Sequence, residues 1–406
     1  MLTSTRTRAS PLSRSKNHAT ISRSRNAADY VSSETGEAYN YFVNTMNDYI
    51  HSKGRDMRIW GTFPPLANYT NNISKDVSVQ HWEFFEDNPY WDYIRNGYSV
   101  VNSDDRVYLV QKWSGSYPQE LNLTFIFHGN PNGSAWSPNI FDVSNATNNA
   151  ARDNPYVLGS IAPQWNDYGA NTSTYIEAYY AWRGGLPAYA DKQWGGKLTE
   201  SEYNSIYDTL QASAPAQNLD RTIPSKSSTI FHYEPSRNTK QPLKDMSPNA
   251  YSGTTNCTAS RPAGLQIRNG CSATTPLKSK GENYTLSFSI RPHTSAPGPI
   301  FTGSDSALYS GNGSSTAVQL ISAGNAFALN YSLPVGEWTD AKLVRNGNRT
   351  FFGVNGREEM EFNTRMGING EYFVWATMAV NAPLEVIGGG GWEGDLKEVK
   401  LVDYAS

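Results

Sequence analysis

The sequence has few cysteines, little charge and no long apolar run. Its only cysteines, Cys257 and Cys271, allow one intramolecular disulfide at most; their close spacing favours that bond, with two free thiols as the alternative. Charged residues make up 17% and the formal net charge is −3, so no basic stripe can neutralise a nucleic-acid backbone. No apolar stretch of about 18 residues predicts a membrane span. At 406 residues, a globular protein of two domains is expected.

Aromatic residues and glycine, in contrast, are abundant. The chain contains 11 Trp, 25 Tyr and 33 Gly. Flat rings stack on the apolar faces of sugars, although most rings in a β-rich protein fill its core. The composition therefore favours a glycan or glycoconjugate as partner, without excluding a purely structural use of the rings.

Glycosylation motifs predict a secreted, extracellular protein. Eleven Asn-x-Ser/Thr sequons are present, a density typical of eukaryotic secreted chains. They lie at Asn68, Asn72, Asn122, Asn132, Asn145, Asn171, Asn256, Asn283, Asn312, Asn330 and Asn348. Residues 1–26 hold six basic side chains and no apolar core, so they are not a signal peptide. A transit peptide would fit them, but the sequons argue against it. We expect a truncated or wrongly predicted N-terminus.

The first half of the chain alternates between strand and helix patterns. Each strand pattern is short and apolar, and several end in Trp. Strands are expected at 57–60, 77–82, 98–101, 107–110 and 157–165, and helices at 34–53, 92–96, 174–183 and 199–213. Such alternation predicts a parallel βα barrel, in which the C-terminal strand ends build the active site.

The second half has no helical periodicity. Short strands separated by Asn-Gly and Gly-rich turns begin at Tyr284 and predict a β-sandwich. The expected organisation is therefore a disordered basic tail at 1–30, a partial barrel at 31–218, a linker at 219–250 and a sandwich at 251–406. The fold class is α/β plus all-β, with part of a (β/α)8 barrel followed by a jelly roll.

Residues 30–215 resemble the second half of the barrel in glycoside hydrolase family 20, the β-N-acetylhexosaminidases and lacto-N-biosidases. The resemblance rests on the order and spacing of several short motifs. These are Arg58-Ile59-Trp60-Gly61, Val79-Gln80-His81-Trp82, Tyr98-Ser99-Val100-Val101-Asn102-Ser103 with Tyr108-Leu109, and Val157-Leu158-Gly159 leading to Trp165-Asn166-Asp167.

This resemblance implies a set of substrate-binding residues. Trp60, Trp82 and Trp165 match the tryptophans that enclose the acetamido group of the sugar. Any one of them alone is better explained as a core residue, but the three in this order favour a pocket. Tyr108 matches the tyrosine that hydrogen-bonds the acetamido carbonyl, and Asp167 matches the acid that accepts sugar hydroxyls. The chain departs from the family where Trp-Asn-Asp replaces Trp-Ser-Glu, and where Val110 replaces an acid.

The family's catalytic pair has no counterpart. In family 20 the substrate's acetamido oxygen attacks its own anomeric carbon, an exception to the two-carboxylate rule, with net retention. A His-x-Gly-x-Asp-Glu signature supplies the Asp that orients this group and the Glu that protonates the leaving oxygen. Asp29 is the nearest counterpart of the signature Asp, but no Glu follows it. Strands one to four of the barrel are also missing, so we expect a truncated, inactive form.

The sandwich resembles laminin-G and concanavalin-like modules. The motifs that carry this resemblance include Val335-Gly336-Glu337-Trp338-Thr339, Phe352-Gly353-Val354-Asn355-Gly356 and Pro383-Leu384-Glu385-Val386-Ile387-Gly388-Gly389. Such modules either bind glycans or brace a neighbouring domain, and the sequence does not choose between these uses.

Two functions follow from these observations. The first is a secreted glycosidase that removes terminal β-linked N-acetylhexosamine or lacto-N-biose. The alternative is a non-catalytic glycan-binding protein that uses the tryptophans and the sandwich. Neither needs a cofactor: His51, His81, His128 and His232 lack metal-ligand spacing, and the glycine run at 388–391 opens no helix. Oligomeric state is undetermined.

Overall fold

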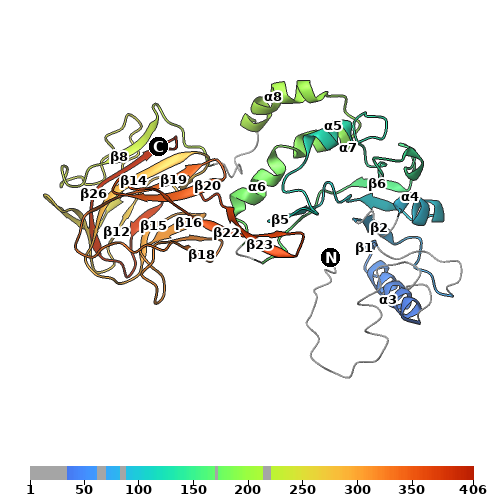
Figure 1. Cartoon of the computed structure of the whole chain (residues 1–406), viewed down its shortest axis with the longest axis horizontal. Coiled ribbons are helices and arrows are strands. Elements are labelled where there is room, and N and C mark those ends of the chain that lie inside the picture. Colours follow the sequence, from blue (N-terminus) through green and yellow to red (C-terminus); the bar gives the residue numbers. More distant parts are fainter. Residues whose placement is uncertain (1–33, 62–69, 83–87, 170–171, 214–220) are drawn as a thin grey trace. The chain divides into compact units, whose positions relative to one another are not determined.

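The computed structural model describes all residues except 1–33, 62–69, 83–87, 170–171 and 214–220 (Figure 1). The chain forms two compact units whose segments interleave along the sequence. The first comprises Met1–Val110, Tyr117–Trp165 and Trp182–Thr209, and the second Gln111–Ser116, Asn166–Ala181 and Leu210–Ser406.

The first unit is a mixed α/β structure around a parallel sheet. Its strands are β1 (Arg58–Trp60), β2 (Ser78–His81), β3 (Val100–Asn102), β4 (Leu109–Val110), β6 (Val157–Ser160) and β7 (Gln164–Trp165). Its helices are α3 (Glu34–His51), α4 (Pro89–Asp92), α5 (Leu123–His128), α7 (Leu186–Gln193) and most of α8 (Glu200–Ala212), with the short 3₁₀ turns η1 (Ile94–Asn96) and η2 (Ala146–Asn148).

Parallel pairing orders the sheet β1-β2-β3-β6, and β4 pairs with β7 separately. Val79 and Val100 on neighbouring strands are fully buried, and Val43 of α3 and Phe141 join the same apolar cluster. Among the described residues these strands form open sheets and no closed barrel. The expected α/β architecture is therefore confirmed, whereas the barrel remains an implication of the family resemblance.

Local sequence signals explain several helix starts. Asn88 caps α4, because its Oδ1 accepts hydrogen bonds from the Tyr90 and Trp91 backbone amides. Thr199 and Glu202 form the capping box expected at the start of α8: the Glu202 carboxylate accepts from the Thr199 amide at 2.8 Å, and Thr199 Oγ1 accepts from the Glu202 amide at 3.2 Å.

The second unit is dominated by two antiparallel sheets. One is ordered β10-β11-β26-β14-β19-β20-β21, with β8 also paired to β26, and the other β18-β17-β16-β15-β25-β12-β9. The strands of the first sheet are β8 (Thr229–Tyr233), β10 (Thr258–Ser260), β11 (Gly264–Ile267), β14 (Tyr284–Pro292), β19 (Thr339–Asn346), β20 (Arg349–Val354), β21 (Met360–Glu361) and β26 (Gly394–Val402). Those of the second are β9 (Thr254–Thr255), β12 (Ser272–Thr274), β15 (Pro299–Thr302), β16 (Ser306–Tyr309), β17 (Gln319–Ser322), β18 (Asn325–Ala328) and β25 (Val386–Gly388).

One apolar core lies between these sheets, as the alternation of the strands dictates. In β14 the side chains of Leu286, Phe288 and Ile290 are buried, and those of β26 that face the same core include Leu396 and Val399. A two-stranded sheet of β13 (Ser279–Lys280) and β24 (Ala382–Pro383) completes this part. The all-β character expected of the second half is confirmed.

Two predicted boundaries differ from the structure. Within the expected linker, β8 pairs with β26, because Ile230, Phe231 and Tyr233 are apolar enough to enter the core. Two segments of the expected barrel also belong to the second unit. Lys112 binds the carboxylate of Glu177 in α6 (Tyr175–Arg183) at 3.0 Å and the Thr377 carbonyl at 2.6 Å, which fastens both segments to the second unit.

A third sheet in this unit is small and mixed. The hairpin of β22 (Asn363–Ile368) and β23 (Tyr372–Thr377) pairs in parallel with β5 (Trp113–Ser114). Pairing of residues about 250 positions apart in the chain could not be foreseen from local pattern, because strand partners are chosen by tertiary packing.

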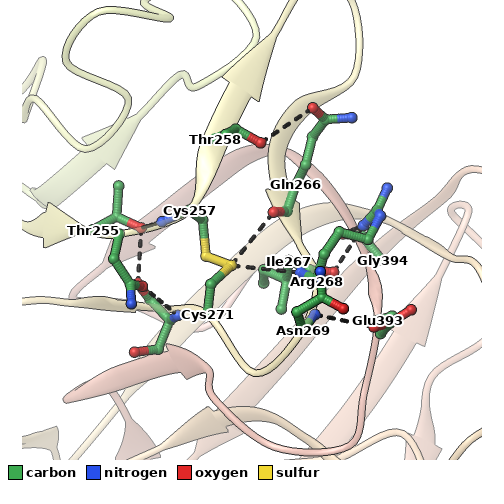
Figure 2. The surroundings of a disulfide bond; sticks show 12 residues. Thr255, Cys257, Thr258, Gln266, Ile267, Arg268, Asn269, Cys271, Glu393 and Gly394 are labelled. Carbon is green, nitrogen blue, oxygen red and sulfur yellow. Dashed lines mark hydrogen bonds between the residues drawn. A yellow bond between two sulfur atoms is a disulfide. The ribbon is translucent and has the colours of Figure 1, made fainter.

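Figure 2 shows the disulfide that joins Cys257 to Cys271. The two Cα atoms are 5.3 Å apart, and Cys271 Sγ accepts a hydrogen bond from the Arg268 amide at 3.4 Å. The bond links the turn before β10 to the residue that precedes β12. Of the two alternatives left open by the sequence, the structure therefore contains the local disulfide.

Candidate functional site

Four of the predicted sugar-binding residues meet in one cluster of rings in the first unit. Trp60 ends β1, Trp82 follows β2, Tyr108 precedes β4 and Trp165 ends β7. All four side chains are half-buried. Trp60 and Trp82 converge because β1 and β2 are parallel neighbours, whose carboxyl ends lie at one edge of their sheet. Tyr108 and Trp165 come from the separate pair of β4 and β7.

Tyr108 is at the centre of this aromatic cluster. Its ring is stacked 5.9 Å from that of Trp165, with an interplanar angle of 19°. Trp82 lies 5.4 Å from Tyr108 at 32°, and Trp60 meets Tyr108 edge-on at 6.1 Å. Trp60 and Trp165 are 5.7 Å apart. These separations are within the range of favourable ring–ring contacts, so the aromatic cluster forms a continuous wall of rings.

The cluster also holds a buried donor. Among the described residues, Trp165 Nε1 is buried and has no hydrogen-bond partner. A buried indole N–H without an acceptor is energetically unfavourable by roughly 1–3 kcal/mol, and such a group is commonly satisfied by a ligand or water. The aromatic cluster can therefore offer both a stacking surface and a hydrogen-bond donor.

Polar residues after β3 hold the neighbouring backbone in place. Asn102 Nδ2 donates to the carbonyl oxygens of Pro138 and Ile140, and its Oδ1 accepts from the Asp104 amide. Asp104 is 1% exposed and accepts from Arg106 Nη1 at 3.1 Å. Burial raises the pKa of Asp104 to about 6, since the half-exposed Arg106 only partly offsets the loss of solvation. Asp104 supports the loop that leads to Tyr108.

The two predicted carboxylates have different outcomes. Asp167 is exposed and belongs to the second unit, two residues after Trp165 in the chain. Asp29 lies outside the residues that the structure describes. The roles of both remain predictions.

A second row of rings, which sequence patterns did not reveal, lies in the second unit on the sheet of β5, β22 and β23. Trp113 stacks on Tyr168 at 4.8 Å and 5°, and Tyr168 meets Phe373 at 5.2 Å. Gly367 makes room for this contact, because a Cβ atom there would come within 1.7 Å of the Tyr168 hydroxyl oxygen. Trp375 lies two residues along β23 from Phe373, is 72% exposed and has the Arg365 guanidinium 5.8 Å from its ring. The alternation of Phe373 and Trp375 was the only signal available in the sequence.

Strand pairing also creates a group of possible metal ligands that residue spacing did not predict. His232 on β8 and Glu234, directly after that strand, lie beside Glu398 on β26. His232 Nε2 is 2.7 Å from Glu398 Oε1, and Arg237 Nη1 is 3.0 Å from Glu234. These side chains already satisfy one another, so the group is adequately explained as a surface ion-pair network.

The first unit thus gathers rings near the ends of parallel strands in an α/β structure, and the second unit contains an antiparallel sandwich. Residues 14–197 match the sequence model of the glycosyl hydrolase family 20 catalytic domain, so this part of the chain resembles that family.

Individual relatives are more distant. A lacto-N-biosidase from Bifidobacterium bifidum is 25% identical over 108 residues, which cover 26% of this chain and 9% of that protein. The chain thus spans a small fraction of that relative.

Solved structures match the chain with low scores. Domain 4 of a family 43 extracellular arabinanase from Geobacillus stearothermophilus has 17% identity and a TM-score of 0.32, over 44% of this chain and 93% of that one. Trypanosoma rangeli sialidase has 12% identity and a TM-score of 0.30, over 51% and 37%. No functional argument rests on either match.

Proposed function

We propose that this chain binds terminal β-linked N-acetylhexosamine, or lacto-N-biose, on secreted or extracellular glycans. The observation that carries the proposal is the convergence of Trp60, Trp82, Tyr108 and Trp165 in one cluster of rings within the segment that matches family 20. A saturated sugar ring presents apolar C–H faces to such rings.

Each residue then has a distinct role. The tryptophans enclose the acetamido group, and the Tyr108 hydroxyl donates a hydrogen bond to its carbonyl oxygen. This bond orients the oxygen toward the anomeric carbon of the same sugar, which is the attack that substrate-assisted retention requires. The general acid is not among these residues, because no Asp in the sequence is followed directly by Glu.

Calorimetric titration with N-acetylglucosamine-thiazoline, a mimic of the cyclised intermediate, tests this proposal. We expect saturable binding by the purified chain. In Trp165→Ala we expect the Kd to rise at least tenfold. Trp194→Ala is the matched control, because Trp194 is in the same unit, is 85% exposed and makes no part of the aromatic cluster. Absence of binding by a folded wild-type chain, or equal binding by both variants, would contradict the proposal.

The ring row of the second unit favours a second candidate function, non-catalytic glycan binding. Phe373 is 57% exposed and Trp375 72% exposed, which is unusual for such large rings. Screening the full chain on immobilised glycans, with Trp375→Ala as variant and Tyr404→Ala as an exposed-ring control, tests this function. Glycan binding that is lost in Trp375→Ala and kept in Tyr404→Ala supports this second function. Glycan binding that is lost in Trp165→Ala and kept in Trp375→Ala contradicts it.

A further inference from the structure

We infer that this chain is N-glycosylated at the sequons in its folded surface. All nine sequon asparagines within the described residues are exposed. They are Asn72, Asn122, Asn132, Asn145, Asn256, Asn283, Asn312, Asn330 and Asn348. The inference is independent of whether the aromatic cluster binds sugar.

Exposure is not a general property of asparagine in this chain. Of the other 23 described asparagines, five are buried and ten are half-buried. Random selection from such a population would seldom yield nine exposed residues in nine. The sequons therefore differ from the remaining asparagines in their surroundings as well as in their sequence.

Many of the other asparagines use the atom that a glycan would modify in structural hydrogen bonds. Eleven described asparagines donate a hydrogen bond from Nδ2, and none of these eleven belongs to a sequon. They are Asn44, Asn47, Asn96, Asn102, Asn139, Asn148, Asn149, Asn249, Asn325, Asn363 and Asn381. In these residues a glycan on Nδ2 would compete with structural hydrogen bonds.

Four sequon asparagines use the other side-chain atom. Oδ1 of Asn122 caps α5 by accepting from the Phe125 amide, and Oδ1 of Asn145 accepts from the Thr147 amide. Oδ1 of Asn256 accepts from the Ser272 amide at 2.9 Å, and Oδ1 of Asn283 accepts from the Gly347 amide at 2.7 Å. Glycosylation leaves the amide oxygen unchanged, so these structural bonds survive it.

The chemistry is a group transfer from a lipid-linked oligosaccharide supplied by the secretory pathway. Nδ2 forms a C–N bond to the anomeric carbon of the first N-acetylglucosamine and loses one proton. The bond from that carbon to the lipid diphosphate breaks, and the lipid diphosphate leaves. No oxidant or reductant is needed. Each added glycan is bulky and solubilising, which suits an exposed position.

The test is to produce the full chain behind a secretion signal in eukaryotic cells and to measure its mass. We expect a mass above the 45.0 kDa of the polypeptide, which returns to about that value after peptide N-glycosidase treatment. Treatment in ¹⁸O-water marks each formerly glycosylated asparagine as ¹⁸O-aspartate, and peptide mass spectrometry should place these marks at the nine exposed sequons. Protein retained in the endoplasmic reticulum is measured in the same way.

A created sequon provides the matched control. Tyr49→Thr turns Asn47-Asp48-Tyr49 into a sequon, although Asn47 is 2% exposed and its Nδ2 donates to Asp76 at 3.2 Å. Tyr49 itself is 59% exposed, so Tyr49→Ala should be secreted normally. We expect Asn47 either to stay unmodified or to carry a glycan only in retained, misfolded protein. Unmodified wild-type protein, or Tyr49→Thr that is glycosylated at Asn47 and secreted like the wild type, would overturn the inference.

Discussion

At the scale of single residues, the two units depend on buried charges in different ways. Asp395 in β26 is completely buried and accepts hydrogen bonds from Arg268 at 2.6 Å, Arg291 at 2.5 Å and His293 at 2.8 Å. Burial alone would raise the pKa of Asp395, but these bonds outweigh it and lower the pKa below its usual value. Its stabilising contribution is therefore present at neutral pH and lost as the pH falls through that lowered pKa.

Replacing Asp395 should destabilise the sandwich. We expect Asp395→Asn to reduce the free energy of unfolding by about 2–4 kcal/mol, because cationic partners lose their carboxylate. Denaturant unfolding followed by circular dichroism measures this change. Asp403→Asn is the control, since Asp403 is exposed just after the same strand. A loss no larger than in the control would show that the network does not contribute to stability.

We expect the contribution of Asp104, in the first unit, to stability to change with pH in the opposite direction. The pKa of Asp104 is about 6 in the folded chain and 3.8 in the unfolded chain. Between these two pH values the folded chain therefore still holds the proton of Asp104, whereas the unfolded chain has released it. The free energy of unfolding should therefore fall as pH rises from about 4 to about 6, by up to about 3 kcal/mol. Thermal unfolding of wild type and Asp104→Asn across this range tests it. The variant should lack this component, and parallel curves would contradict the assignment.

At the scale of elements, the Cys257–Cys271 disulfide fixes short strands that have little core of their own. β9, β10 and β12 contain two or three residues each, so pairing alone orders them weakly. The bond closes a loop with a sequence separation of 14, for which chain entropy predicts about 3 kcal/mol of stabilisation.

The double variant Cys257→Ser, Cys271→Ser should lose about this amount of unfolding free energy. Wild-type protein unfolded with a reductant present should match it, because reduction removes the same cross-link. Denaturant titration with and without dithiothreitol makes the comparison. Equal stability of oxidised and reduced wild type would show that the strands are ordered without the bond.

The pattern of residues within the hairpin of β22 and β23 does not determine which strand pairs with it. The strand that pairs with this hairpin, β5, comes from the part of the chain that matches family 20. Gly367 on β22 is needed as glycine only because Tyr168 occupies the space where its side chain would be. No local rule connects these two positions.

At the scale of the whole molecule, sugar binding and turnover should separate. A purified 406-residue chain should not hydrolyse a chromogenic N-acetylglucosaminide above the buffer blank, since the acid that must protonate the leaving oxygen has no candidate in its sequence. A continuous absorbance assay measures this at several enzyme concentrations. Turnover that is proportional to enzyme and reduced in Trp165→Ala would contradict the prediction.

The parallel sheet of the first unit and the antiparallel sheets of the second unit have separate apolar cores. No helix among the described residues is long and apolar enough to cross a membrane. The described residues form one apolar cluster around the parallel sheet and a larger one between the antiparallel sheets. Each core is built from residues of its own unit, which is what independent domains require.

The sequence alone determined the class of each half and the members of the aromatic cluster. Helix caps such as Thr199 with Glu202, the alternation in β14 and the tryptophans at strand ends are local signals, so they could be read directly. The family 20 resemblance then named Trp60, Trp82, Tyr108 and Trp165, and the structure brings these four together.

Tertiary structure alone decided the rest. The membership of β5 and α6 in the second unit, the burial of β8 and the ring row of Trp113, Tyr168 and Phe373 depend on contacts between distant segments. So does the exposure of the described sequon asparagines, since most of the other described asparagines are buried or half-buried. Local sequence fixes how a residue can bond, but only the folded chain determines which partners and how much solvent reach it.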